Sequence, residues 1–217
     1  MTKAAEPTQT AGDLNARTDA VVVESKDVAF RAYFRVDRYT LRHAQFAGGL
    51  GSAITRELLE RGHAVAVLPY DPVRDEVVLL EQFRIGALAA GMGPWLLEVV
   101  AGVIDPGETA EAVAARETKE ESGCHVADLE SVARWLSSPG CTSETVELFV
   151  GRVDSSRVGG VHGLAQEGED IRPVAMAADA FLDLLHQGRL DNATVLIAAQ
   201  WLALNRAALR ARWLGSS

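Results

Sequence analysis

The order of the hydrophobic segments predicts a mixed α/β layered domain that follows a β-rich N-terminal segment. Apolar runs of strand length come first, an Ala- and Glu-rich helical stretch follows, and two more strand candidates precede a helical C-terminus. We find no internal repeat in the sequence. With 217 residues, the chain is long enough to bury a sizeable core.

The first 60 residues are expected to form a tail and a β-rich segment. Residues 1–19 are polar and rich in Ala and Thr, and we expect a disordered tail there. Within residues 20–60, β-branched and aromatic residues are enriched at 21–23 and 33–41, but charged side chains alternate with them. This mixture is typical of exposed or edge strands. After a Gly-rich break at 48–51, residues 56–61 are interpreted as a short charged stretch.

Residues 61–217 are expected to form the main domain. Apolar runs at 63–69 and 76–82 flank an Asp- and Pro-containing turn and predict a hairpin, and a third apolar run covers 95–104. Residues 108–122 lack Gly and Pro and predict a helix, which Gly123 is suited to end. Strands are predicted at 131–136 and 145–153, a Gly-rich acidic loop at 159–170, and helices at 177–185 and 192–214.

Composition excludes several classes of protein. The net charge of −9 argues against a dedicated nucleic-acid binder. No segment approaches the ~18 apolar residues of a spanning helix, so we expect no membrane partner. Cys124 and Cys141 lack zinc-site spacing and are interpreted as small buried side chains in a reducing compartment. We therefore expect a cytoplasmic protein.

Three carboxylates gather on one face of the predicted helix. Glu117, Glu120 and Glu121 are separated by three and four positions, so their charges repel. Arg116 can offset part of this repulsion by pairing with Glu120. A hard divalent cation such as Mg²⁺ relieves it fully. The alternative is a solvated acidic helix face, but the turn at 102–107 places backbone groups beside these carboxylates and favours a site.

This segment resembles the Nudix box, G-x5-E-x7-R-E-U-x-E-E-x-G-U, in which U is aliphatic. The fixed positions are matched by Gly102, Glu108, Arg116, Glu117, Glu120, Glu121 and Gly123. Thr118 and Cys124 replace the two aliphatic residues, which removes no ligand. The resemblance implies a Nudix α/β/α sandwich with a mixed sheet. It also implies Mg²⁺-dependent hydrolysis, with Mn²⁺ as a substitute, of a nucleoside diphosphate linked to another group.

Other segments are similar to bacterial ADP-ribose pyrophosphatases: residues 71–79, 81–84, 94–98, 138–144, 163–171 and 191–201. This resemblance implies cleavage of ADP-ribose to AMP and ribose 5-phosphate. It also implies that residues 20–60 pair with a second subunit, giving a homodimer with shared active sites.

The resemblance further implies roles for individual residues. The metal ligands would be Glu117, Glu121, Glu169 and the carbonyl of Ala101. Glu167 would be the general base, with Glu120 as a further catalytic carboxylate, while Glu108 and Arg116 would orient the ligands. The residues alone favour the alternative, in which Glu167 and Glu169 are solvated loop carboxylates, and only the resemblance reverses this preference.

Substrate contacts follow from the same resemblance. Arg84 would clamp a phosphate, and Arg56 and Glu144 would contact substrate, Glu144 from the partner subunit. Tyr33 or Phe34 would stack on adenine. Surface ion pairs or core aromatic residues are the structural alternatives at these positions.

Two other functions stay open at this point. One is a Nudix enzyme for another substrate, such as GDP-mannose, NADH or a dinucleoside polyphosphate. The other is a catalytically silent nucleotide-sugar sensor on the same fold. The presence of every box carboxylate counts against the sensor, because a degenerate site is expected to have lost one of them.

Overall fold

The computed structural model describes residues 20–164, 166 and 168–215, which group into two compact units. The first contains the N-terminal strands up to Arg61 together with Ser138–Ser143. The second contains Gly62–Ser137 and the chain from Glu144 onward. The predicted tail, residues 1–19, lies outside the described residues. The dimerisation role expected for residues 20–60 stays a prediction.

The first unit is built on a three-stranded antiparallel sheet. Its strands are β1 (Val21–Arg31), β2 (Arg35–His43) and β3 (Ile54–Glu60), in that order. All of β1 is exposed, as the alternating charges predicted. The interpretation of residues 56–61 as a charged stretch is wrong, because β3 pairs along β2 from Arg35 to Leu41. Hydrogen bonding to β2 makes this segment a strand, although its charged side chains alone do not indicate one.

One charged side chain is buried in this first sheet. Asp37 on β2 is fully buried, and its carboxylate pairs with Lys26 at 3.0 Å and Arg35 at 2.9 Å. Burial alone would raise the pKa of Asp37, but hydrogen bonds from these two cations outweigh it, so the pKa is lowered. The aspartate therefore stays ionised within the sheet.

The second unit is built on a seven-stranded mixed sheet. Its strands are β4 (His63–Asp71), β5 (Glu76–Phe83), β6 (Trp95–Glu98), β7 (Val100–Ile104), β8 (Asp128–Leu136), β9 (Thr145–Arg152) and β10 (Arg172–Ala177). The main order is β10-β5-β4-β9-β8, and only β4 and β9 run parallel. The sheet is therefore mixed, as the Nudix resemblance implied.

The predicted β4–β5 hairpin is confirmed, but the two strands separate soon after the turn. Their direct pairing covers Tyr70–Val77 and Asp71–Glu76. Beyond these pairs, β6 pairs with β5 and β7 pairs with β4. The apolar run predicted at 95–104 is thus two strands, which meet at Val99, a buried residue. This split brings the start of β7 beside the helix that follows it.

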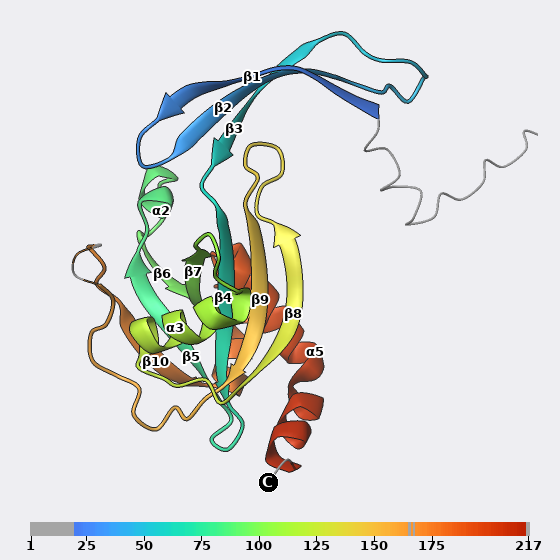
Figure 1. The fold of residues 1–217 in the computed structure, drawn as a ribbon. Coiled ribbons are helices and arrows are strands. Elements are labelled where there is room, and N and C mark those ends of the chain that lie inside the picture. Colours follow the sequence, from blue (N-terminus) through green and yellow to red (C-terminus); the bar gives the residue numbers. More distant parts are fainter. Residues whose placement is uncertain (1–19, 165, 167, 216–217) are drawn as a thin grey trace, which may run out of the picture. The chain divides into compact units, whose positions relative to one another are not determined.

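Helices cover both faces of the large sheet (Figure 1). Alternate β4 residues point to opposite faces: Val65 and Val67 pack with α3 (Ala110–Ser122). Ala66 and Leu68 instead pack with α4 (Ala178–His186) and α5 (Ala193–Gly215). The two cores thus form the predicted α/β/α sandwich.

Local signals set the ends of α3. Thr109 caps the first turn by accepting a hydrogen bond from the Ala112 N–H, at 3.2 Å. Gly123 ends the helix with φ 71°, a left-handed conformation that suits glycine. Thr118, a departure from the box pattern, is fully buried and donates its hydroxyl to the Ala114 carbonyl. The helix itself therefore satisfies the polar group at this aliphatic position.

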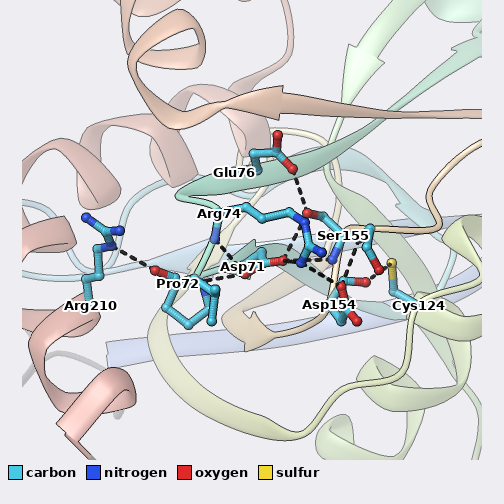
Figure 2. A network of polar contacts seen from close by, with 10 residues as sticks. Asp71, Pro72, Arg74, Glu76, Cys124, Asp154, Ser155 and Arg210 are labelled. Carbon is cyan, nitrogen blue, oxygen red and sulfur yellow. Dashed lines mark hydrogen bonds and ion pairs between the residues drawn. The ribbon is translucent and has the colours of Figure 1, made fainter.

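A buried polar network fixes the β4–β5 turn, as Figure 2 shows. Asp71 is 1% exposed and accepts hydrogen bonds from the backbone of Val73, Arg74 and Ser155 and from the Ser155 hydroxyl. Burial alone would raise the pKa of Asp71, but the hydrogen bonds from Ser155 and Arg74 outweigh this effect, so the pKa is lowered overall. The network therefore holds an ionised aspartate in the interior.

Three features were not predicted. The short helix α2 (Ile85–Ala89) and strand β10 were missed in the sequence. Cys124 is buried as expected, but the prediction for Cys141 is wrong, because this residue is exposed in the 138–143 segment. Within the described ranges, no helix is long and apolar enough to cross a membrane.

Candidate active site

The acidic face of α3 lies against the start of β7. Glu121, 3% exposed, accepts a hydrogen bond from the Ala101 N–H at 3.0 Å. Gly102 has no room for a side chain, because a Cβ atom there would overlap the carboxyl group of Glu117. The glycine of the box thus lets strand and carboxylate approach closely.

The electrostatics of this face favour a bound cation. Burial, together with the charges of Glu117 and Glu169, raises the pKa of Glu121 to about 8, although the Ala101 N–H and Arg84 lower it. Burial and the Glu120 charge also raise the pKa of Glu117, against the lowering effect of Arg116. At both carboxyl groups, burial and the neighbouring negative charges therefore outweigh the nearby arginines.

Arg116 joins the carboxylates at the edge of this face. Its guanidinium contacts Glu117 at 2.9 Å, Glu120 at 3.2 Å and Glu108 at 3.4 Å. Glu108 also accepts a hydrogen bond from the Asp105 N–H, at 3.2 Å. Glu108 and Arg116 thus connect the turn before α3 to the carboxylates on that helix.

The loop at 159–170 reaches the same face. His162 and Ile171 exchange backbone hydrogen bonds of 2.8 and 3.1 Å, which fasten the two sides of the loop together. Glu169 accepts a hydrogen bond from the Leu164 N–H at 3.0 Å and contributes to the pKa shifts of Glu117 and Glu121. The predicted base, Glu167, lies outside the described residues.

Arg84 is held beside this face by a buried carboxylate that the predicted site did not include. Glu98, at the end of β6, accepts hydrogen bonds from Gln82 at 3.0 Å, Arg84 at 2.8 Å and Asn192 at 2.6 Å. The sequence did contain a signal: Glu98 is a lone charge inside the apolar run 95–104. A buried charge of this kind requires partners.

A family model described as the NUDIX domain matches residues 60–212, most of the chain. The chain belongs to the Nudix family. The ADP-ribose pyrophosphatase of Escherichia coli (strain K12) is 45% identical over 193 residues, 89% of this chain and 92% of the relative. The ADP-ribose pyrophosphatase of Haemophilus influenzae is 40% identical, covering 89% and 90% of the two chains.

A solved structure described as an ADP compounds hydrolase has the same fold. It superposes with a TM-score of 0.63 at 22% identity, covering 85% of this Nudix chain and 95% of the other. The fold class predicted from the sequence is therefore confirmed.

The donor set of this Nudix site fits a magnesium ion, although the carboxylates are not drawn together. No three histidine, cysteine, aspartate or glutamate side chains of the described ranges lie close enough to hold a metal. Glu117, Glu121 and Glu169 instead accept hydrogen bonds from Arg116, Ala101 and Leu164, respectively. Their oxygens are hard donors, and a divalent cation would stabilise the ionised form of Glu121, which burial and the charges of Glu117 and Glu169 disfavour.

The remaining predicted substrate residues are distributed over both units. Arg56 on β3 and the Tyr33–Phe34 pair, whose rings meet edge to face at 4.8 Å, belong to the first unit. Tyr33 is 92% exposed in the turn between β1 and β2. Glu144, which is buried, immediately precedes β9 in the second unit. Their substrate roles stay predictions.

Proposed function

We propose that this Nudix protein hydrolyses the pyrophosphate bond of ADP-ribose, with Mg²⁺, to AMP and ribose 5-phosphate. The observation that carries the proposal is the face formed by Glu117, Glu121 and Glu169 beside Ala101 and Gly102, with Arg84 near it. The substrate rests on the two ADP-ribose pyrophosphatases, each of which aligns with about nine-tenths of the chain.

Glu117, Glu121, Glu169 and the Ala101 carbonyl would hold the metal, with Mn²⁺ as a substitute for Mg²⁺. A bound divalent cation would neutralise phosphate oxygens and acidify a water molecule. Arg116 now pairs with Glu117 and would exchange that contact for others, while its bond to Glu108 keeps it at the edge of the site. Glu120, with its side chain one-third exposed, is more open to solvent than Glu117.

Proton removal from the attacking water falls to Glu167 in this proposal. The described residues of the same loop support this choice: His162 pairs with Ile171, and the charge of Glu169 acts on the α3 carboxylates. The loop glycines permit the movement needed for closure over substrate.

Arg84 is the best-supported substrate contact, because a guanidinium can make two parallel hydrogen bonds to a phosphate group. Arg56, Glu144 and a ring of Tyr33 or Phe34 complete the proposed substrate contacts, with Glu144 reaching across from a partner subunit. A homodimer with shared sites, acting in the cytoplasm, follows from the same proposal. A monomer in light scattering at micromolar concentration would remove the shared site.

Product analysis tests the reaction. Purified protein is incubated with ADP-ribose and Mg²⁺, with and without EDTA, and nucleotides are separated by chromatography. We expect AMP that disappears with EDTA. Cleavage of GDP-mannose, NADH or a dinucleoside polyphosphate, but not of ADP-ribose, would keep the Nudix chemistry and overturn the substrate. If none of these nucleotides is cleaved but ADP-ribose still binds, the protein would instead be a catalytically silent nucleotide-sugar sensor.

A further inference from the structure

We propose that Glu98 is a positioning residue for catalysis: together with Asn192, it holds the Arg84 guanidinium in the orientation that receives the substrate pyrophosphate. This inference rests on the proposed function, because it assigns Arg84 to a phosphate. It adds two residues from distant parts of the sequence to the working site.

The carboxylate of Glu98 is surrounded by donors. Its Oε2 accepts hydrogen bonds from Gln82 Nε2 at 3.0 Å and from Arg84 Nε at 2.8 Å, and it lies 2.8 Å from Arg84 Nη2 in an ion pair. Its Oε1 accepts from Asn192 Nδ2 at 2.6 Å. Because its side chain is only 7% exposed, little of this carboxylate is open to solvent or substrate. It therefore acts on the reaction through its partners.

The geometry of Arg84 leaves one side of its guanidinium for a ligand. The Nε–Nη2 side faces Glu98, which leaves Nη1 outside the contact with this carboxylate. Glu98 is 7% exposed in its side chain, whereas Arg84 is 45% exposed. The buried end of the pair is thus fixed and the open end is available. A hydrogen bond from Nε and an ion-pair contact from Nη2, both on one side of the planar group, set its orientation as well as its position.

The pair of Arg84 and Glu98 lies next to the catalytic face along the chain. Glu98 ends β6, and on the next strand Ala101 donates its N–H to Glu121, a proposed metal ligand, at 3.0 Å. A phosphate held there would contact both Arg84 and a cation on Glu121. Small rotations of Arg84 would therefore shift the phosphorus relative to the attacking water.

Asn192 connects this arrangement to the last helix. Its side-chain oxygen accepts from the Thr194 N–H at 2.8 Å and caps the start of α5, while its nitrogen binds Glu98. The backbone of Arg84 is fixed separately, because its N–H donates to the Pro94 carbonyl at 2.7 Å. Backbone and side chain are thus held independently, which is what precise positioning of a flexible arginine requires.

A double-mutant cycle tests the inference. Glu98→Gln and Arg84→Ala are made singly and together, and kcat/KM for ADP-ribose is measured with binding of its uncleavable α,β-methylene analogue. We expect Glu98→Gln to lower kcat/KM on the order of 10–100-fold in the wild-type background, since displacements near 1 Å have effects of this size. In the Arg84→Ala background the same change should have less than about a twofold effect, because the two residues act as one unit.

Two further variants separate positioning from folding. Asn192→Ser keeps an oxygen that can cap α5 but is too short to reach Glu98, so we expect the same non-additive loss in kcat/KM per folded molecule. Asp71→Asn is the matched control: it alters another buried carboxylate of the second unit, in the network of Figure 2. It should lower the free energy of unfolding and leave kcat/KM per folded molecule unchanged.

The outcomes are distinct. Equal losses from Glu98→Gln in both Arg84 backgrounds would overturn the inference, as would wild-type kcat/KM and analogue binding in Asn192→Ser. Should Glu98→Gln fail to fold, the cycle between Asn192→Ser and Arg84→Ala decides by the same criterion. A wild-type protein that forms no AMP and does not bind the analogue overturns the proposed function itself, and with it this inference.

Discussion

The close approach of Gly102 to Glu117 makes one substitution a strong test of the site. In Gly102→Ala, the added Cβ would lie under 3.0 Å from Cγ, Cδ and Oε1 of Glu117, a separation that real Cβ atoms essentially never show. Because non-bonded heavy atoms settle about 3.5–4.0 Å apart, the carboxyl group must retreat by about 1 Å or more. Misplacement by 1 Å can reduce a rate about 10²-fold, so we expect that loss in kcat.

Stability should respond much less than turnover. The Glu117 side chain is 15% exposed, so it can rotate outward toward Arg116 without opening a cavity. The assay is AMP formation across a Mg²⁺ titration, with unfolding in urea measured in parallel. Gly93→Ala is the control, because a Cβ there meets nothing within 4 Å and its backbone conformation is ordinary. Wild-type kcat in Gly102→Ala would refute the reasoning, and so would an equal loss in Gly93→Ala.

Three further predictions concern pH, the last helix and the loop. The pKa of Glu121 is about 8 in the folded state but near 4.5 in the unfolded state. Between these values the folded state retains a proton that the unfolded state releases. The Tm of EDTA-treated protein should therefore fall as the pH rises from 5 to 8. Glu121→Gln should make this decline shallower and abolish turnover, while Glu117, whose pKa is also raised, keeps part of the slope. An unchanged Tm slope in the variant contradicts the burial argument. Arg206→Met removes ion pairs to Asp75 and Asp179 and should lower the free energy of unfolding by about 1.5–3 kcal/mol in urea titrations, with activity per folded molecule retained. Glu167→Gln should slow kcat by about 10²–10⁴-fold at unchanged metal affinity, and a parallel loss of affinity would instead make Glu167 a ligand.

The sequence predicted the layered α/β class and the acidic face well because both depend on local periodicity, whereas the α/β/α sandwich was implied by the Nudix resemblance. The helix of the box needed an uninterrupted run and Gly123 at its end, and both are visible in the sequence, whereas its cap, Thr109, was found in the structure. The close contact between Gly102 and Glu117 follows from the strand directly preceding that helix. These features involve residues near one another in the sequence, so the sequence alone can predict them.

The missed elements depend on partners far along the chain. β10 contains Pro173 and has weak strand propensity, yet it pairs with β5 as an edge strand, where proline is tolerated. α2 has five residues, fewer than periodicity can reveal. β4 and β5 separate because β7 pairs with β4 and β6 pairs with β5. The alternation of apolar and polar residues predicts a strand but does not predict which strand lies beside it.

Glu98 illustrates the same limit within the site. Its place in an apolar run marks it as unusual, but its meaning comes from Asn192, 94 positions later. No spacing rule joins residues so far apart. The functional contribution of such a residue becomes visible when the folded chain brings its partners together.

The bond between Glu98 and Asn192 also orders events during synthesis of the protein. A ribosome produces the box carboxylates and Arg84 long before α5, whose residues Val195, Leu202 and Leu209 fill one core of the sheet. Until Asn192 and this helix have left the exit tunnel, Glu98 lacks the hydrogen bond from Asn192, and one face of the sheet stays uncovered. Nascent chains and products of early termination should therefore carry the acidic helix without pyrophosphatase activity, which delays hydrolysis until translation of the catalytic domain is complete.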